Sequence, residues 1–166
     1  LEQIHEMHRP LIARGREVGI DYAMDDVISS STRRAHELGH FAQARGRGPE
    51  MMRRLFRAHW SEGLNLDDVD VLVRLAEEVG LDPEQARTAL QERTWQRAVE
   101  DDLTVARSLG VQGVPFFVLD SRYAVSGAQP PEVLLEALGT AWAASAEGSE
   151  ADDDGAAGTD GHRSAH

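Results

Sequence analysis

The spacing of apolar residues changes from helical to strand-like late in the chain, and this change limits the folds that the chain can adopt. From Leu1 to Leu109, apolar residues recur at three- and four-residue steps, the spacing of one face of an α-helix. An uninterrupted apolar run, Phe116–Leu119, then follows, and a turn at residues 120–122 separates it from Tyr123–Val125. This second pattern predicts a β-hairpin. We therefore expect a mostly helical chain with one hairpin late in the sequence.

Glycines, prolines and capping residues divide the helical part into six expected helices. The clearest start is Asp82-Pro83-Glu84-Gln85, which combines an N-cap acid, an N1 proline and an N3 glutamine. Glycines that follow helical patterns predict the ends of several of the others. A seventh helix is expected after Pro130-Pro131. Its predicted inner face consists of Val133, Leu134, Leu138 and Trp142.

Composition and pattern together predict three parts. Residues 1–110 form a helical domain, and residues 111–144 form a hairpin and a helix. Residues 145–166 carry six acids, one arginine and no large apolar residue. Such a segment cannot bury enough surface to offset its ordering entropy, so we expect a disordered acidic tail.

The predicted hairpin is too small a sheet to be stable by itself. A run of apolar residues without alternation is typical of a strand that is covered on both faces. An isolated two-stranded hairpin is marginally stable in water. We therefore expect further strands, either from residues outside this sequence or from another chain. The hairpin edge near Val114 or Tyr123 should pair with another chain, which could be a second copy in a homodimer, or lie under helices.

Charge, hydropathy and cysteine content exclude several classes of function. A net charge of −12 argues against a nucleic-acid partner, because a phosphate backbone calls for a clustered basic face. No apolar run has the 18 or more residues that predict a membrane span. The chain has no cysteine, which removes thiolate nucleophiles, disulfides and cysteine-ligated zinc from its own chemistry. We expect a soluble protein and predict no cofactor.

Two motifs near the hairpin carry a family resemblance. Residues 113–118 read GVPFFV, and residues 123–129 read YAVSGAQ. Upstream, Ala35-His36 and His40 form an AHxxxH segment. Together these motifs resemble the DsbA-like thioredoxin-fold proteins, and among them the FrnE-like branch, over about residues 1–143.

The resemblance implies an α/β thioredoxin-like fold of the DsbA type with a large all-helical insertion. In that family the first βαβ unit bears a CxxC pair. This sequence lacks that unit, and we interpret it as a cysteine-free fragment of a cytoplasmic disulfide oxidoreductase or isomerase that acts on proteins or glutathione-like thiols. The resemblance also implies a cis bond before Pro115 and a substrate-docking edge at Val114, Pro115 and Phe116. Without the resemblance, Pro115 would only mark the start of a strand.

Two other interpretations remain open at this stage. His36-Glu37-Leu38-Gly39-His40 spells HExxH, which on a helix would supply two zinc ligands and a general base, with His59 or Glu62 as a third ligand. The same histidines lie beside an apolar helix face, where hydrogen-bonded histidines without metal are common. The chain could also be a non-catalytic helical module for binding or dimerisation. Finally, Met51, Met52, Phe56 and Trp60 could line a groove for an apolar ligand or pack in the core.

Overall fold

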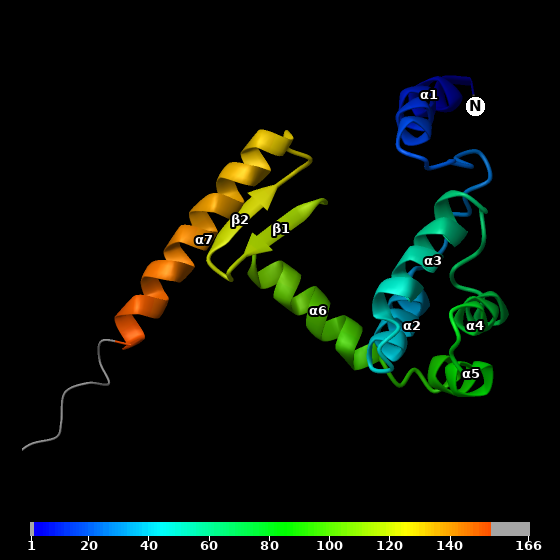
Figure 1. Cartoon of the computed structure of the whole chain (residues 1–166). Helices are drawn as coiled ribbons and strands as arrows, with labels where there is room; N and C mark the ends of the chain where they lie inside the picture. Colours follow the sequence, from blue (N-terminus) through cyan, green and yellow to red (C-terminus); the bar gives the residue numbers. More distant parts are fainter. Residues whose placement is uncertain (1, 154–166) are drawn as a thin grey trace, which may run out of the picture. The chain divides into compact units, whose positions relative to one another are not determined.

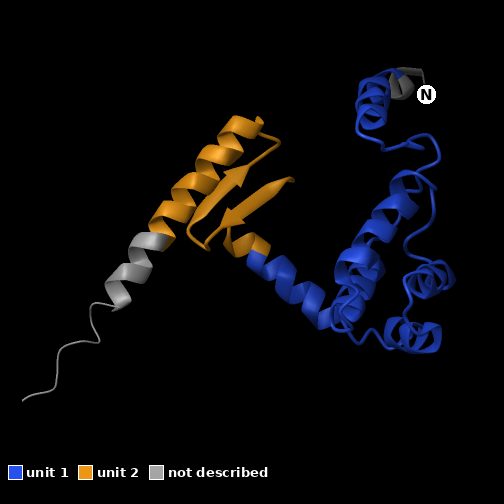
Figure 2. Cartoon of the chain, in the orientation of Figure 1, with its two compact units in different colours: residues 1–105 blue, residues 106–166 orange. Residues whose placement is uncertain are grey.

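The computed structural model describes residues 2–153 and divides the chain into two compact units, Leu1–Val105 and Ala106–His166 (Figure 2). Within this described part, unit 1 holds five helices and most of a sixth. Unit 2 holds two strands and a long helix (Figure 1). The elements of unit 1 are α1 (Glu2–Glu17), α2 (Arg33–Gln43), α3 (Gly48–Trp60), α4 (Val69–Glu78), α5 (Pro83–Gln91) and most of α6 (Gln96–Ser108). Unit 2 holds the end of α6, then β1 (Phe116–Leu119), β2 (Tyr123–Ser126) and α7 (Pro131–Asp153).

Local signals place the helix ends of unit 1. The side chain of Asp82 caps α5 by accepting a 2.9 Å hydrogen bond from the backbone N–H of Gln85, which confirms the predicted start. Asp68 caps α4 in the same way, through the N–H groups of Asp70 and Val71. Each cap satisfies backbone donors that the first helical turn leaves unpaired.

The core of unit 1 lies between α2, α3, α4 and α5. Helix α2 contacts all three of the other helices. The largest apolar side chains that are fully buried there are Leu38, Phe41, Met51, Leu72, Leu75 and Leu90. Burial of side chains of this size is the main favourable contribution to folding, at about 1.5–3 kcal/mol for each.

One charged side chain is buried within this apolar core. Glu37 on α2 is only 1% exposed, and its carboxylate accepts three hydrogen bonds of 2.6–3.0 Å from the guanidinium of Arg93. These hydrogen bonds from the guanidinium to Glu37 raise the pKa of Arg93. Arg93 adopts a left-handed backbone conformation, with φ at 55°, in the turn between α5 and α6. The ion pair therefore joins this turn to α2.

A second ion-pair network connects α3 to the end of α4. Arg54 donates hydrogen bonds to Glu78 at 2.6 Å and to Glu62 at 2.9 Å. The hydrogen bond from Arg54 lowers the pKa of Glu78, although its partial burial acts in the opposite direction. The hydrogen bond from Arg54 to Glu78 is therefore strongest when the Glu78 carboxylate is ionised.

In unit 2, β1 and β2 form an antiparallel two-stranded sheet, as predicted. The register pairs Phe116 with Ser126 and Leu119 with Tyr123. Asp120 and Ser121 both have positive φ, at 51° and 53°, as the tight turn of a short hairpin requires. Helix α7 contacts both strands. The predicted order of elements, a mostly helical chain with a hairpin and a final helix, is thus confirmed.

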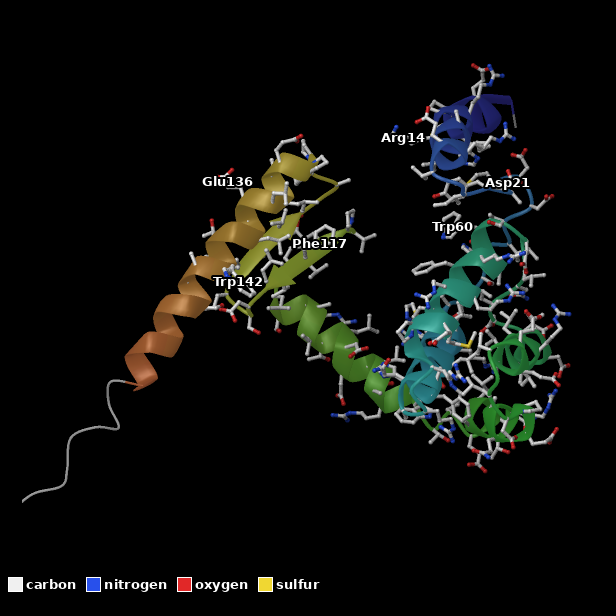
Figure 3. The ribbon with its side chains drawn as sticks, viewed as in Figure 1. Arg14, Asp21, Trp60, Phe117, Glu136 and Trp142 are labelled. Carbon is white, nitrogen blue, oxygen red and sulfur yellow. The ribbon has the colours of Figure 1, made fainter. Side chains whose placement is uncertain are left out.

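The inner face of α7 differs from the predicted one. Ala141 is buried, and Leu134, Ala137 and Ala144 are half-buried, so these residues form the packed face. The prediction was wrong for Val133, Leu138 and Trp142, which are 41%, 51% and 81% exposed (Trp142 is labelled in Figure 3). The apolar positions of α7 surround the helix, so the periodicity could not select one face.

Helix α7 also extends beyond the predicted start of the acidic tail. The tail was expected from Ser145, whereas the helix ends at Asp153. Alanine and glutamate have high helix propensity, which favours this extension. The rest of the predicted tail, residues 154–166, lies outside the described residues.

The buried ion pair gives a prediction for stability. Arg93→Ala would leave the Glu37 carboxylate buried without its partner, and we expect the free energy of unfolding to fall by about 3 kcal/mol. Urea denaturation followed by circular dichroism measures this change. Arg97→Ala is the matched control, because the Arg97 side chain is 83% exposed and pairs with Asp101 in its own helix; the loss there should stay below about 0.5 kcal/mol. Equal losses in the two variants would contradict the role of the buried pair.

The lowered pKa of Glu78 gives a prediction for pH dependence. A carboxylate with a depressed folded-state pKa stabilises the fold above its ordinary pKa of 4.5, and this contribution is lost as the pH falls through the folded-state pKa. We expect Glu78→Gln to reduce stability at neutral pH and to lose less stability than the parent chain below pH 4.5. Thermal unfolding across this pH range measures both slopes. Parallel slopes would show that Glu78 makes no such contribution.

Candidate functional site

The segment before β1 presents an exposed apolar turn. Val114 is 90% exposed, and its peptide bond to Pro115 is cis. The carbonyl oxygen of Pro115 accepts a 2.8 Å hydrogen bond from the N–H of Gly127, which ties the segment to the end of β2. Phe116 is half-buried and begins the strand. The three predicted site residues thus follow one another along an exposed turn that ends at the half-buried Phe116.

The backbone of this segment has free hydrogen-bonding capacity. In the described part of the chain, the N–H and C=O groups of Val114 make no hydrogen bond to other residues. Strand β1 has one neighbour there, β2, so its other edge is unpaired. An unpaired edge of this kind is a template for an added strand.

The chemistry available at this edge is limited. Residues 109–119 contain no ionisable side chain. This segment also contains no serine, threonine or cysteine, so it offers no side chain that could act as an acid, a base or a nucleophile. The segment itself can bind an extended polypeptide through backbone hydrogen bonds and apolar contacts.

The HExxH residues lie on α2, but their surroundings differ from those of a zinc site. Glu37 is buried in its ion pair with Arg93, so it cannot serve as a general base. His40 Nε2 lies 2.9 Å from a carboxylate oxygen of Asp102, and its ring stacks on Trp95. His36 lines a small apolar cavity. No group of three or more metal-ligating side chains occurs in the described part of the chain. The zinc-hydrolase interpretation is therefore wrong, because the glutamate that would act as general base is buried and paired with Arg93.

The four residues considered for an apolar groove divide between the core and the surface. Met51 is fully buried and Met52 is half-buried, whereas Phe56 is 59% exposed and Trp60 is 36% exposed. Phe56 and Trp60 line a cavity of about 900 Å³ beside residues 19–22. Met52 joins them in an adjoining cavity of about 100 Å³.

Sequence reasoning missed the partners of Glu37 and His40. Arg93 and Asp102 lie more than 50 residues further along the chain, at sequence separations of 56 and 62. One signal was available for Glu37, because this acid lies next to the apolar residues of the helix face that the sequence predicted. A charge in that position calls for a buried partner.

Among the described residues, no helix is both long and apolar enough to cross a membrane.

Comparison with known proteins gives a family match. The sequence model of the DSBA-like thioredoxin domain matches residues 1–139. The chain is 35% identical over 105 residues to the uncharacterized protein YwbO of Bacillus subtilis (strain 168), an alignment that covers 63% of this chain and 52% of that protein. A solved structure, described as a probable DsbA oxidoreductase from Streptomyces coelicolor, is 38% identical with a TM-score of 0.80, and the match covers 86% of this chain and 62% of that one. The chain therefore spans about half the length of YwbO and less than two thirds of the solved structure.

Proposed function

The chain belongs to the family of DSBA-like thioredoxin domains, and from this premise we propose that it provides the substrate-docking edge of a thiol–disulfide oxidoreductase of the FrnE-like branch. The observation that carries the proposal is the free backbone of Val114 beside the unpaired edge of β1. The substrate is an extended protein segment, or the peptide-like backbone of a glutathione-type thiol. Val114, Pro115 and Phe116 hold it.

The proposed role of the edge is to position the substrate disulfide, not to break it. In thiol–disulfide exchange a thiolate attacks one sulfur of a disulfide, a mixed disulfide forms, and a second thiol resolves it. Attack requires the target sulfur to be held in line with the thiolate. Hydrogen bonds between the backbone of Val114 and the substrate backbone would hold the segment next to the reacting sulfur. Every polypeptide sequence offers such backbone groups. This suits a substrate class of many different proteins.

The thiols themselves must come from elsewhere. This sequence contains no cysteine, so residues outside it, or another molecule, supply the dithiol. We also propose a cytoplasmic setting, as the resemblance to the FrnE-like branch implies.

A second candidate function uses the same edge. Because β1 is unpaired on one side in the described part, two copies of the chain could pair there as a homodimer. This would make the chain a non-catalytic dimerisation module. Analytical ultracentrifugation over a range of concentrations distinguishes the two candidates.

Substitutions at Val114 test the docking edge. Val114→Pro removes the N–H group, whereas Val114→Ala keeps it, so the pair isolates the backbone contribution. We expect Val114→Pro to weaken binding of a permanently unfolded protein, such as reduced and carboxymethylated α-lactalbumin, by about tenfold. Val114→Ala should change it by less than about threefold. Isothermal titration calorimetry measures the affinities, and amide chemical shifts of residues 111–117 report the contact.

If both Val114 variants bind the unfolded protein as tightly as the parent chain does, the proposal that the edge at Val114 docks substrates is wrong. Binding of the unfolded protein that shifts only amides of unit 1 would also count against it.

The lack of cysteine predicts the outcome of a redox assay. The isolated chain should not accelerate the reduction of insulin by dithiothreitol, because it has no thiol to form the mixed disulfide. Turbidity of the precipitating insulin chains measures the rate. Addition of thioredoxin to the same assay is the positive control. Acceleration by the chain alone would contradict the division between docking and exchange.

A further inference from the structure

Unit 1 carries a groove that the docking edge does not use. It is a cavity of about 900 Å³, lined by residues 19–22 and by side chains from the C-terminal half of α3. Ligand sites usually have volumes of about 300–1,000 Å³. Three aromatic side chains, Tyr22, Phe56 and Trp60, line it together with Arg53 and Arg57. Figure 3 labels Asp21 and Trp60, which come from its two walls.

The two walls of the groove are joined by specific contacts. The N–H of Ala23 donates a 2.8 Å hydrogen bond to the carbonyl of Trp60, and the ring of Tyr22 meets that of Trp60 edge-on at 6.3 Å. Gly63, with φ at 61°, follows the lining residues Ser61 and Glu62, and a Cβ at this position would lie 2.6 Å from the carbonyl oxygen of Asp26. Only glycine permits this approach. These contacts hold residues 22–26 against the end of α3.

A smaller cavity adjoins the groove. It has a volume of about 100 Å³, shares Phe56 and Trp60 with the groove, and has an almost entirely apolar lining that includes Leu55 and Leu66. A dry apolar cavity of about 150 Å³ accommodates benzene, so this one suits a branched aliphatic side chain. His59 also lines it, and the Nδ1 atom of His59 is buried without a hydrogen-bond partner in the described part of the chain.

The uncompensated charge of the groove is positive. Arg57 is paired with Glu62 at 3.0 Å, and Asp21 lies 3.8 Å from Arg16. Arg53 is exposed and makes no ion pair with any described residue. In a chain of net charge −12, this places a free cation beside an apolar cavity. Charge complementarity favours an anionic group in the ligand at this point.

We propose that the groove binds extended peptide segments that carry a leucine-sized side chain next to an acidic residue. The aliphatic side chain occupies the small cavity, the carboxylate faces Arg53, and the peptide backbone lies across Phe56 and Trp60. That the ligand is a polypeptide rests on the proposed function, in which the substrates are proteins. The groove would give unit 1 a sequence preference that the backbone-directed edge at Val114 lacks.

Fluorescence anisotropy with the full 166-residue chain and labelled heptapeptides tests the proposal. We expect Gly-Ser-Glu-Leu-Glu-Ser-Gly to bind about tenfold more tightly than the same peptide with alanine for leucine. It should also bind more tightly than the peptide with lysine in both glutamate positions, although the negative chain attracts that peptide more strongly at long range. Equal affinity for all three peptides, or none detectable, would overturn the proposal. Competition by free 4-methylpentanoate as strong as that of the heptapeptide would overturn it too, because a small carboxylate would then be the ligand.

Variants locate the binding site on the chain. Phe56→Ala should weaken binding of the acidic leucine peptide by about tenfold, and Arg53→Ala by about three- to fivefold, an effect that added salt reduces. Both side chains are exposed, so the fold should be retained, and circular dichroism checks this. Arg97→Ala is the matched control, and it should bind as the parent chain does.

Val114→Pro separates this proposal from the proposed function. It should leave binding of the heptapeptide unchanged even where it weakens binding of an unfolded protein. If Val114→Pro abolishes heptapeptide binding while Phe56→Ala does not, the peptide binds at the hairpin edge and the groove proposal is wrong.

Discussion

The packing of unit 1 depends on the placement of one charged side chain inside an apolar core. Helix α2 contacts α3, α4 and α5, and it buries Glu37 beside its apolar residues. An unpaired carboxylate there would cost several kcal/mol, so Arg93 offsets most of the cost of burying Glu37. Arg93 lies in the turn that leads into α6, and that turn has a left-handed residue at the point of contact. The ion pair thus sets where α6 leaves the bundle.

The two units offer different kinds of recognition. In the proposed function, the edge at Val114 offers backbone groups and no ionisable side chain, so it would hold many polypeptides without selecting among them. The proposed groove beside α3 offers aromatic rings and Arg53, which has no ion-pair partner among the described residues, so it would distinguish one side chain from another. Neither surface contains a group that breaks or forms a covalent bond with sulfur. In the proposed function, binding by this chain and exchange by a dithiol are therefore separate tasks.

Much of the fold followed from local patterns. The start of α5 at Asp82-Pro83 and the hairpin between Phe116 and Val125 were predictable, because caps and turns act over a few residues. The inner face of α7 was not predictable, because apolar residues surround that helix and only contact with the strands selects a side. The HExxH motif shows the same limit. The motif does lie on a helix, but Glu37 is buried and paired with Arg93, 56 positions further along the chain. This pairing excludes the zinc hydrolysis that the motif suggested.

The sequence by itself determined which chemistry the chain cannot perform, where its helices begin, and the family to which its VPFF and SGAQ motifs point. These depend on residue identity and on neighbours within a few positions. Only the tertiary structure decided that Val114 is exposed and that Arg53 lies beside an aromatic groove, each without a partner among the residues that the structure describes. Exposure and pairing depend on which distant segments pack against a residue. That packing is settled by the balance of burial and desolvation over the whole unit, which no short stretch of sequence contains.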